Sequence, residues 1–352
     1  MSEQAPDRWV DHDLAAPFRR FDADAVAGLL AQGWGLVARD LVRLDTERDD
    51  TFLATLGSDT VVVKVAHPAD DAALVDLQVR ALQHAADRDP ALPLPRLRPD
   101  TAGAPVRRVA GAQGEPRLAR VLDYLPGSTL EYALTDAAQR RAVGRAAGRL
   151  SAALADFDHP AAGRVLPWDL QQVASLRPLL AAIGDPAVAT DVAAVLDRYD
   201  AEVGPRLRAA RQQVVHNDLN PDNVLVDPAG PEFVTGILDF GDVVRTAVVA
   251  DLAVAMAYAV GADHAFERHH VDPWAAPYDV AEGFVSVREL DDDEAALLPD
   301  LVVTRLAQRL LVNSWLAASD PANAGYTARS VEHAARALRR LASAPAPASG
   351  VG

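Results

Sequence analysis

One segment of the sequence, residues 214–242, constrains the fold more than any other. Two short apolar runs, residues 224–226 and 234–238, are separated by a turn-forming Pro-Ala-Gly-Pro sequence and predict a β-hairpin. Polar residues stand at both outer ends of this hairpin: His216, Asp218 and Asn223 before it and Asp239 after it. Because a hairpin brings its two ends together, we expect these polar groups to lie close to one another.

The residue types at these ends suit phosphoryl transfer. Carboxylate and carboxamide oxygens are good ligands for Mg²⁺. Beyond bound metal, the reaction needs mainly a carboxylate that orients and deprotonates the attacking hydroxyl. Asp218 offers that carboxylate, while Asn223 and Asp239 offer metal ligands from the two arms of the hairpin. Asp and Asn taken singly are ordinary turn formers, but their combination and order favour a catalytic site.

The order of the other expected elements predicts the fold class. Strand-like runs come first and helical periodicity follows, which is typical of α+β proteins with segregated elements. The expected helices are residues 22–32 and 70–86, and the expected strands are residues 36–44, 51–56, 60–65, 106–110 and 117–124. We expect three regions: a lobe of residues 1–125, a helical lobe of residues 126–342, and a disordered Ala/Pro-rich tail of residues 343–352.

The composition argues against several classes of protein. A formal net charge of −16 over 352 residues argues against nucleic-acid binding. The absence of cysteine excludes disulfides and thiolate sites. The apolar runs are shorter than the ~20 residues that cross a bilayer, and the N-terminus lacks a basic segment followed by an apolar one. We therefore expect a cytoplasmic monomer or homodimer that binds neither membrane nor nucleic acid and takes a cationic or zwitterionic small molecule.

The chemistry-bearing segment resembles known kinases. The His-x-Asp-x-x-x-x-Asn pattern of residues 216–223 and the Asp-Phe-Gly of residues 239–241 resemble the catalytic and metal loops of the protein kinase-like fold. More narrowly, the chain resembles the aminoglycoside phosphotransferase superfamily. Three segments are similar to its hydroxylysine-kinase-like branch: residues 167–170, 234–242 and 251–258. The resemblance implies a two-lobed α+β fold, with an N-terminal antiparallel β-sheet lobe carrying one main helix and a larger, mostly helical C-terminal lobe.

The resemblance also implies roles for the residues around the hairpin. Asp218 matches the catalytic base, and Asn223 and Asp239 match the ligands of Mg²⁺. His216 matches a residue that supports the catalytic loop through hydrogen bonds. A zinc-binding role for His216 is disfavoured because the neighbouring sequence offers no partner ligands.

Two further carboxylates are expected to support the site. Asp242 follows the metal loop and either assists it or contacts the acceptor. Asp251 is expected to tie down the loop while capping a helix that begins at Leu252. Trp168 and Asp169 either line the acceptor pocket or belong to the core.

Lys64 is the expected phosphate-binding lysine. It stands as a single charge in a run of valines, and the resemblance implies that it contacts the phosphates of ATP from the third strand. Kinases pair this lysine with a glutamate on the next helix. Gln78 occupies that place here and Asp76 lies two residues earlier, so the partner of Lys64 is open between a hydrogen bond to Gln78 and a contact with Asp76.

The rest of the nucleotide site is expected on two connecting segments. Residues 45–50 contain none of the glycines of a kinase phosphate loop. Either Thr46, Arg48 and the backbone amides of this turn approach the phosphates, or the segment is an ordinary charged hairpin, and the sequence leaves both open. Adenine is expected beside Leu122 and Tyr124, at the junction of the lobes. The preference for ATP over GTP is open.

A small acceptor is expected rather than a protein. Only a short connector separates Asp239 from Asp251, and no Ala-Pro-Glu follows it, whereas protein kinases have a long activation segment. The branch resemblance favours an amino alcohol or a hydroxy amino acid such as 5-hydroxylysine. An aminoglycoside or macrolide antibiotic kinase is the alternative within the enzyme class, and a nucleotide-binding pseudokinase or adaptor is the alternative outside it.

Overall fold

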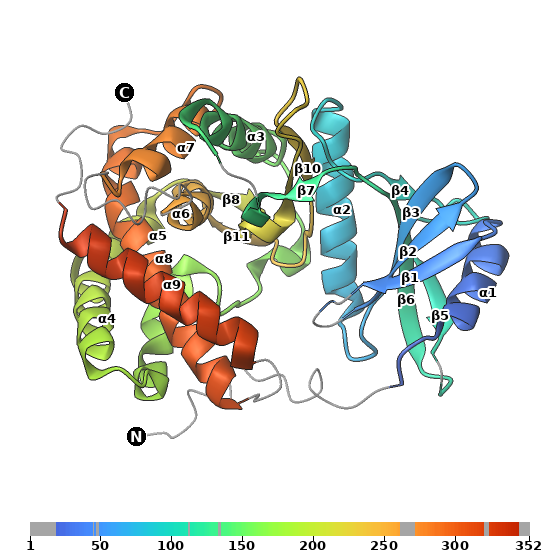
Figure 1. Cartoon of the computed structure of the whole chain (residues 1–352), viewed down its shortest axis with the longest axis horizontal. Coiled ribbons are helices and arrows are strands. Elements are labelled where there is room, and N and C mark those ends of the chain that lie inside the picture. Colours follow the sequence, from blue (N-terminus) through green and yellow to red (C-terminus); the bar gives the residue numbers. More distant parts are fainter. Residues whose placement is uncertain are drawn as a thin grey trace.

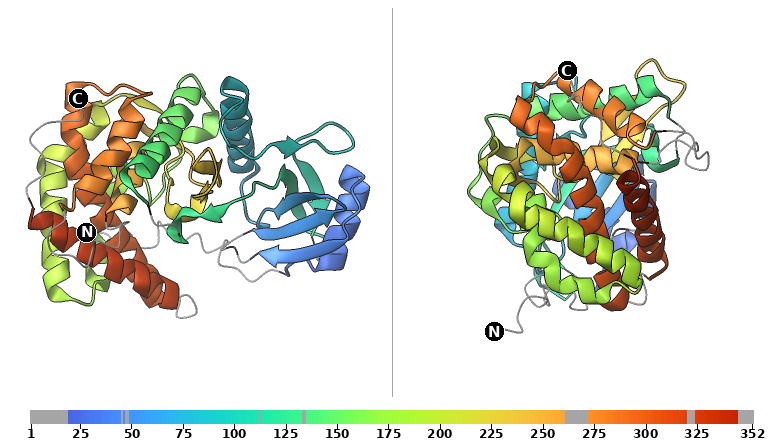
Figure 2. Two further views of the ribbon diagram at one scale, coloured as in Figure 1. Left: turned by 45° about the horizontal axis from the view of Figure 1, so that its top comes forward. Right: turned by 90° about the vertical axis from the view of Figure 1, so that its left-hand side faces the viewer.

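The structure is a computed structural model that describes residues 19–44, 46, 49–111, 113–132, 135–260, 272–319 and 324–344. Its N-terminal part is an antiparallel β-sheet with helix α1 on one side, and its C-terminal part is made mostly of helices (Figure 1). Helix α2 (Ala72–Arg88) lies between these two parts, and the views in Figure 2 show the same separation. The predicted α+β class, with the sheet first, is confirmed.

The N-terminal sheet positions the residues on one side of the candidate site. Its order is β1-β2-β3-β6-β4, with β5 also pairing with β6. The strands are β1 (Asp40–Leu44), β2 (Asp50–Leu56), β3 (Asp59–Val65), β4 (Leu97–Arg98), β5 (Arg107–Ala110) and β6 (Pro116–Asp123). Thr51 in β2 and Arg120 in β6 are the register partners of Lys64 in β3. Because side chains directly opposite one another share a face, these polar residues lie on the same face of the sheet.

Two differences from the predicted strands have local causes. The predicted strand of residues 36–44 begins only at Asp40, because the backbone of Gly35 turns left-handed at a φ of 67° to end α1 and Leu36 N–H still bonds to the carbonyl of Leu30. Strand β4 was not predicted. It is two residues long and lies between prolines, which normally argue against a strand.

The apolar residues form two separate cores. Helix α1 (Ala23–Trp34), capped by Asp22, packs Val26 and Leu30 against the valines of β3 in the smaller core. Helix α2 buries Leu77 and Ala81 in the larger core, together with residues of the C-terminal helices. Helix α2, which lies between β3 and β4 in the sequence, therefore shares its core with the C-terminal part.

The C-terminal part is helical, as predicted. Its α-helices are α3 (Ala137–Ala153), α4 (Pro186–Arg198), α5 (Gly204–Ala209), α6 (Val248–Ala259), α7 (Ala275–Val285), α8 (Asp292–Ser319) and α9 (Ala324–Ala342). The 3₁₀ or π segments are η1 (Leu130–Tyr132), η2 (Pro160–Gly163), η3 (Leu170–Ala182), η4 (Tyr199–Val203) and η5 (Pro221–Asn223). Nearly every residue of α6 is buried, so this helix is the central element around which the others pack.

The predicted hairpin is present. Strands β9 (Val224–Val226) and β10 (Val234–Ile237) pair antiparallel with one irregularity in register. Two further short pairs were not predicted: β7 (Ser128–Thr129) joins β9, and β11 (Val244–Ala247) joins β8 (Gln212–Val215). The second of these pairs fixes the chain just before the catalytic loop and just after the metal loop.

Other sequence-based predictions concern the ends and surroundings of the chain. Within the residues that the structure describes, no helix has both the length and the apolar character needed to cross a bilayer. The lobe boundaries near residues 125 and 342 stay predictions. Most of the predicted tail, residues 345–352, lies outside the described residues.

Candidate active site

The two loops that carry the expected catalytic groups have unusual backbone geometry. Asn217 has a φ of 67° and Asp239 a φ of 51°, and no other non-glycine residue in the described ranges has a positive φ. Such angles cost free energy unless the surroundings enforce them, and they gather at functional sites. The Asn217 N–H donates to Asp251 Oδ1 at 2.7 Å, and the Gly241 N–H donates to Asp239 Oδ1 at 2.9 Å. Each strained residue is thus held by a specific hydrogen bond.

His216 joins the two loops. It is fully buried, its Nε2 lies 2.8 Å from the carbonyl oxygen of Leu238, and its Nδ1 accepts the Asp218 N–H at 3.3 Å. This bonding pattern assigns the proton to Nε2. The ring also meets Phe240 edge to face, with the ring centres 5.0 Å apart. These contacts fit the supporting role that the sequence indicated for His216, a role that stays a proposal.

The prediction that Asp251 caps a helix beginning at Leu252 is wrong. Helix α6 already begins at Val248, so Asp251 lies within its first turn, and the N-cap residue Ala247 makes no side-chain cap. The Asp251 carboxylate bonds to the Asn217 N–H instead. Burial raises the pKa of Asp251, and the nearby His216 and the Asn217 N–H oppose that rise. Asp251 therefore ties down the catalytic loop directly from α6.

Asp218 is surrounded by hydrogen-bond donors. The Asn220 Nδ2 lies 3.0 and 2.9 Å from its two carboxylate oxygens, and the Asn223 Nδ2 lies 2.7 Å from Oδ2. Burial raises the pKa of Asp218, whereas the Arg305 guanidinium and His216 act against the rise. A partly desolvated carboxylate with fixed orientation is what a general base requires.

Lys64 and Asp239 meet across the site. The Lys64 Nζ lies 3.4 Å from Asp239 Oδ2. The Lys64 ammonium lowers the pKa of Asp239 to about 2, with smaller help from the Gly241 N–H and the Arg120 guanidinium. Lys64 is also the only lysine in the whole sequence. That solitary lysine, in strand β3, is brought to the loop that follows β10.

The donor set fits a divalent metal. The amide nitrogen of Asn223 is bonded to the Asp218 backbone and side chain, which leaves its oxygen, Oδ1, as the group that would face a cation. Asp239 has one oxygen bonded to Gly241 and the other facing Lys64. The Leu238 N–H bonds to the carbonyl of Asn223 at 2.8 Å, which keeps the two loops adjacent. Oxygen donors of this kind suit Mg²⁺.

Asp242 lies close to Asp239 in the sequence, but its carboxyl group has a much higher pKa. Burial and the neighbouring Asp218 raise the pKa of Asp242 to about 7, and Arg164 opposes the rise. An Arg164 nitrogen lies 3.7 Å from the Asp242 carboxylate and also donates to the carbonyl of Gly241. Asp239 and Asp242 lie on either side of the pair Phe240 and Gly241. Their carboxyl groups differ in pKa because only Asp239 faces Lys64.

Arg305 is a site residue that the sequence did not predict. It lies on α8, is 1% exposed, and has Nη2 3.9 Å from Asp218 Oδ1. Its guanidinium carbon lies 5.0 Å from the ring centre of Trp168 and 5.9 Å from that of Tyr258. The sequence contains only a weak signal, a charge inside an apolar helix. Trp168 thus lies next to this cation.

Asp169 is a structural residue. It is 2% exposed and caps η3 by accepting the Gln171 N–H at 3.0 Å. The Thr246 hydroxyl also donates to Asp169 at 2.8 Å. Of the two roles that were left open for this residue, the structure places it in the core.

Gln78 has a different partner from the one expected. Its Oε1 accepts a hydrogen bond from Arg120 Nη2 at 3.2 Å, and within the described residues no hydrogen bond joins it to Lys64. Asp76 is also directed elsewhere, to His159 Nε2 at 3.1 Å. Neither Gln78 nor Asp76 therefore takes the place of the glutamate that pairs with the lysine in kinases. Arg120, which was not predicted from the sequence, lies on β6 together with two other charged residues, Arg117 and Asp123.

The other expected nucleotide contacts are only partly described. The Thr46 hydroxyl donates to the carbonyl of Asp49 at 2.8 Å and lies 3.1 Å from the Thr51 hydroxyl, so it stabilises the turn before β2. Arg48 lies outside the described residues. Leu122 is buried near the end of β6, whereas Tyr124 is 44% exposed just beyond it. Their contact with adenine stays a prediction.

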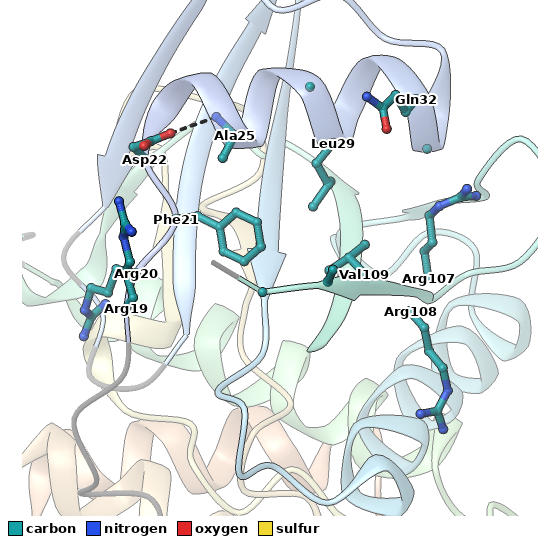
Figure 3. A pocket seen from close by; sticks show the side chains of 14 residues that line it. Arg19, Arg20, Phe21, Asp22, Ala25, Leu29, Gln32, Arg107, Arg108 and Val109 are labelled. Atoms are coloured by element: carbon teal, nitrogen blue, oxygen red, sulfur yellow. Dashed lines mark hydrogen bonds between the residues drawn. The ribbon is translucent and has the colours of Figure 1, made fainter. Parts of the chain in front are cut away.

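A cavity of about 650 Å³ lies elsewhere, between α1 and β5 (Figure 3). It is lined in part by four arginines: Arg19, Arg20, Arg107 and Arg108. Arg107 already pairs with Asp100 at 2.9 Å. Helix α1 packs on the face of the sheet that carries Val61 and Val63, which is opposite to the face of Lys64. This cavity is therefore separate from the candidate active site.

The sequence matches a known protein family. The model of the family described as "Phosphotransferase enzyme family" matches residues 40–291. A hydroxylysine kinase of Danio rerio is 27% identical over 329 residues, which is 90% of this chain and 90% of that protein. A homoserine kinase of Beijerinckia indica is 33% identical over 225 residues, covering 61% of this chain and 62% of the relative.

Solved structures share the fold. An amicoumacin kinase in complex with AMP-PNP and Ca²⁺ superposes with a TM-score of 0.65 at 16% identity, covering 90% of this chain and 94% of the other. A microcompartment-associated aminopropanol kinase gives a TM-score of 0.63 at 21% identity, covering 92% and 98%. The two-lobed kinase-like architecture that the sequence predicted is thereby confirmed.

Proposed function

We propose that this chain, which belongs to the phosphotransferase enzyme family, transfers the γ-phosphoryl group of ATP to a hydroxyl group of a small zwitterionic molecule. We propose a hydroxy amino acid such as 5-hydroxylysine as the acceptor. One observation carries the proposal: the hairpin ends bring Asp218, Asn223 and Asp239 together, with Lys64 facing them. A carboxylate base, metal-binding oxygens and a phosphate-binding cation are the parts that phosphoryl transfer requires.

The proposed reaction assigns a role to each part of the site. Asp218 accepts a hydrogen bond from the acceptor hydroxyl and takes its proton as the hydroxyl oxygen bonds to the γ-phosphorus. The bond from that phosphorus to the bridging oxygen breaks, and ADP leaves. The amide groups of Asn220 and Asn223 keep the Asp218 carboxylate oriented, and Lys64 offsets the charge of the phosphates.

Asn223 and Asp239 would hold Mg²⁺, which supplies charge neutralisation at the phosphates when it is bound. The low pKa of Asp239, about 2, keeps this ligand ionised at all physiological pH values. His216 and Asp251 keep the two loops in register through the bonds to Leu238 and Asn217. Leu122 and Tyr124 are proposed to contact adenine, and Thr46 to shape the turn above the phosphates.

The charges around Asp218 support a zwitterionic acceptor. Asp242 offers a carboxylate to an ammonium group, while Arg305 offers a buried guanidinium to a carboxylate close to the base. The relatives with sequence similarity are named for hydroxylysine and homoserine, both hydroxy amino acids. A polycationic aminoglycoside would place positive charge near Arg305, so that alternative is disfavoured.

The proposal is tested by acceptor-dependent ADP release in the presence of ATP and Mg²⁺. The acceptor panel contains 5-hydroxylysine, homoserine, 1-amino-2-propanol and spectinomycin, and lysine serves as the matched compound without a hydroxyl. We expect turnover with a hydroxy amino acid and none with lysine. Asp218→Asn should lower kcat by about 10²–10⁴-fold without changing ATP affinity appreciably.

Other results of the same assay point to other functions. Turnover with spectinomycin alone would assign the chain to antibiotic modification. ATP binding that is unaffected by Asp218→Asn, with no ADP release from any acceptor, would indicate a nucleotide-binding protein without transferase activity. Turnover with 1-amino-2-propanol equal to that with 5-hydroxylysine would show that Arg305 does not select a carboxylate.

A further inference from the structure

Arg120 shares the face of the sheet that carries Lys64. The two residues are direct register partners in β3 and β6, which lie side by side (Figure 1). Their sequence neighbours Val63 and Val121 point the other way, into the core beneath α1. Because side chains alternate along a strand, Arg120 projects toward the side on which Lys64 meets Asp239.

The surroundings of the Arg120 guanidinium leave part of it without a partner. Nη2 lies 3.2 Å from Asp49 Oδ2 and 3.2 Å from Gln78 Oε1. Nη1 is buried, and within the described part of the chain no hydrogen-bond partner is present for it. Arg120 as a residue is only 7% exposed. A buried cation with an unused donor is costly, unless a ligand supplies the missing acceptor.

The position of Asp49 adds a second indication. This residue lies in the connection between β1 and β2, beside the turn held by Thr46. In the kinase-like arrangement that connection covers the phosphates of the nucleotide. Arg120 therefore links the phosphate-covering connection to α2, on which Gln78 lies.

We infer that Arg120 is a second phosphate-binding cation of the nucleotide site, positioned by Gln78 and Asp49. This inference rests on the proposed function, because it concerns the same bound nucleotide. An oxygen of the phosphates provides the acceptor that Nη1 lacks. Gln78 is suited to this role because its amide oxygen orients the guanidinium without adding a second carboxylate to that of Asp49, which already pairs with Arg120. A glutamate at position 78 would add a second negative charge beside the guanidinium.

The inference is tested by measuring the affinities of ATP, ADP and adenosine for the full-length protein by calorimetry. Arg120→Gln should weaken ATP and ADP binding by about 10–100-fold, the usual effect of losing a hydrogen bond to a charged group. Adenosine binding should change less than about twofold, because adenosine carries no phosphate. Arg120→Lys should give an intermediate loss. Arg108→Gln, at an exposed position of β5, is the matched control and should behave as the wild type.

Gln78→Glu gives an independent test that does not remove Arg120. It should weaken ATP binding several-fold and leave adenosine binding unchanged, because the new carboxylate competes with the phosphates for the guanidinium. Stronger ATP binding or a higher kcat in Gln78→Glu would overturn the inference, since it would mean that position 78 serves Lys64 as in other kinases. If Arg120→Gln does not fold, Arg120→Lys and Gln78→Glu still decide the question.

The pattern of losses separates the possible explanations. Equal losses for ATP, ADP and adenosine in Arg120→Gln would show a purely structural role and overturn the inference. Unchanged affinities for all three would overturn it as well. Wild-type protein that binds adenosine and ATP equally, and shows no ADP release, would overturn the proposed function together with the inference. Normal wild-type ATP binding with no effect of Arg120→Gln would overturn the inference alone.

Discussion

The two sides of the candidate site carry opposite charges and are built in different ways. The anionic side, with Asp218, Asp239 and Asp242, comes from one continuous stretch whose loops are held by hydrogen bonds between side chains and the backbone. The cationic side, with Lys64 and Arg120, comes from strands that are adjacent only after folding, and Arg120 is oriented by other side chains. Isosteric changes on the anionic side should therefore affect chemistry more than folding. Changes on the cationic side should affect nucleotide affinity.

The largest expected effect beyond Asp218→Asn is on the anionic side, for Asp239→Asn. Asn tolerates the positive φ of this position, so the fold should persist while the metal loses its charged ligand. We expect kcat/KM to fall by about 10²–10³-fold, with a higher Mg²⁺ requirement and an unchanged circular dichroism spectrum. Asp222→Asn, at an exposed position in the same segment, is the control. Activity within tenfold of the wild type would remove Asp239 from the proposed metal site.

The cationic side can be tested through its unique amine. Lys64 is the only lysine, so an amine-directed acylating reagent has no target other than Lys64 and the α-amino group. Acylation should abolish phosphoryl transfer, and ATP with Mg²⁺ should protect Lys64, as followed by peptide mass spectrometry. Lys64→Met should lower kcat/KM for ATP by roughly 10–100-fold. Full activity after complete acylation of Lys64 would contradict its role.

Arg305 lies on the anionic side but carries a positive charge. Replacing it therefore tests how the charges around Asp218 control the protonation of that residue. Its guanidinium opposes the rise in the pKa of Asp218. Removing it in Arg305→Met should raise that pKa further, and the base would then be protonated up to a higher pH. The acid limb of the kcat/KM profile should therefore move to higher pH. Arg145→Met, exposed on α3, should leave the profile in place; a shift of the same size there would contradict the assignment.

The smallest expected effect concerns the stability of the unliganded protein. The pKa of Asp242 is raised from 3.8 to about 7 in the folded state, so the folded form binds a proton that the unfolded form releases between these pH values. Stability therefore falls as pH rises from about 4 to 7. Asp242→Asn should remove this dependence and stabilise the protein at pH 8 by on the order of 1–3 kcal/mol. The gain in Tm should vanish near pH 4, and a constant gain at all pH values would contradict this account.

The same contrast between the two sides explains what the sequence allowed us to predict. The hairpin and its polar ends were predictable because their spacing lies within 30 residues and local turn chemistry sets it. Arg305 and Arg120 were missed because their relation to Asp218 and Lys64 depends on helix packing and strand register. Asp251 was assigned to a helix cap because the true start of α6, at Val248, lacks the usual capping residue.

The family resemblance was a better guide to the catalytic loop than to the partner of Gln78. Gln78, which the resemblance placed at the position of the kinase glutamate, does lie on the helix after β3, yet the resemblance did not reveal its hydrogen-bond partner. The identity of the residue opposite Lys64 in β6 decides that partner. Recognition of the catalytic loop required no such information, because its residues bond mainly to one another.

The division of the apolar residues into two cores has a mechanical consequence. Helix α2 is anchored in the larger core through Leu77 and Ala81, whereas β2, β3 and most of β6 are anchored in the smaller core. A rotation of α2 relative to the sheet would therefore change the separation of Gln78 and Arg120. The chain has no cysteine, so one cysteine introduced on α2 and one on β2 can be labelled with a fluorescent pair. The energy transfer between the labels would report the distance between α2 and the sheet, and its change on addition of ATP would show whether nucleotide binding moves them.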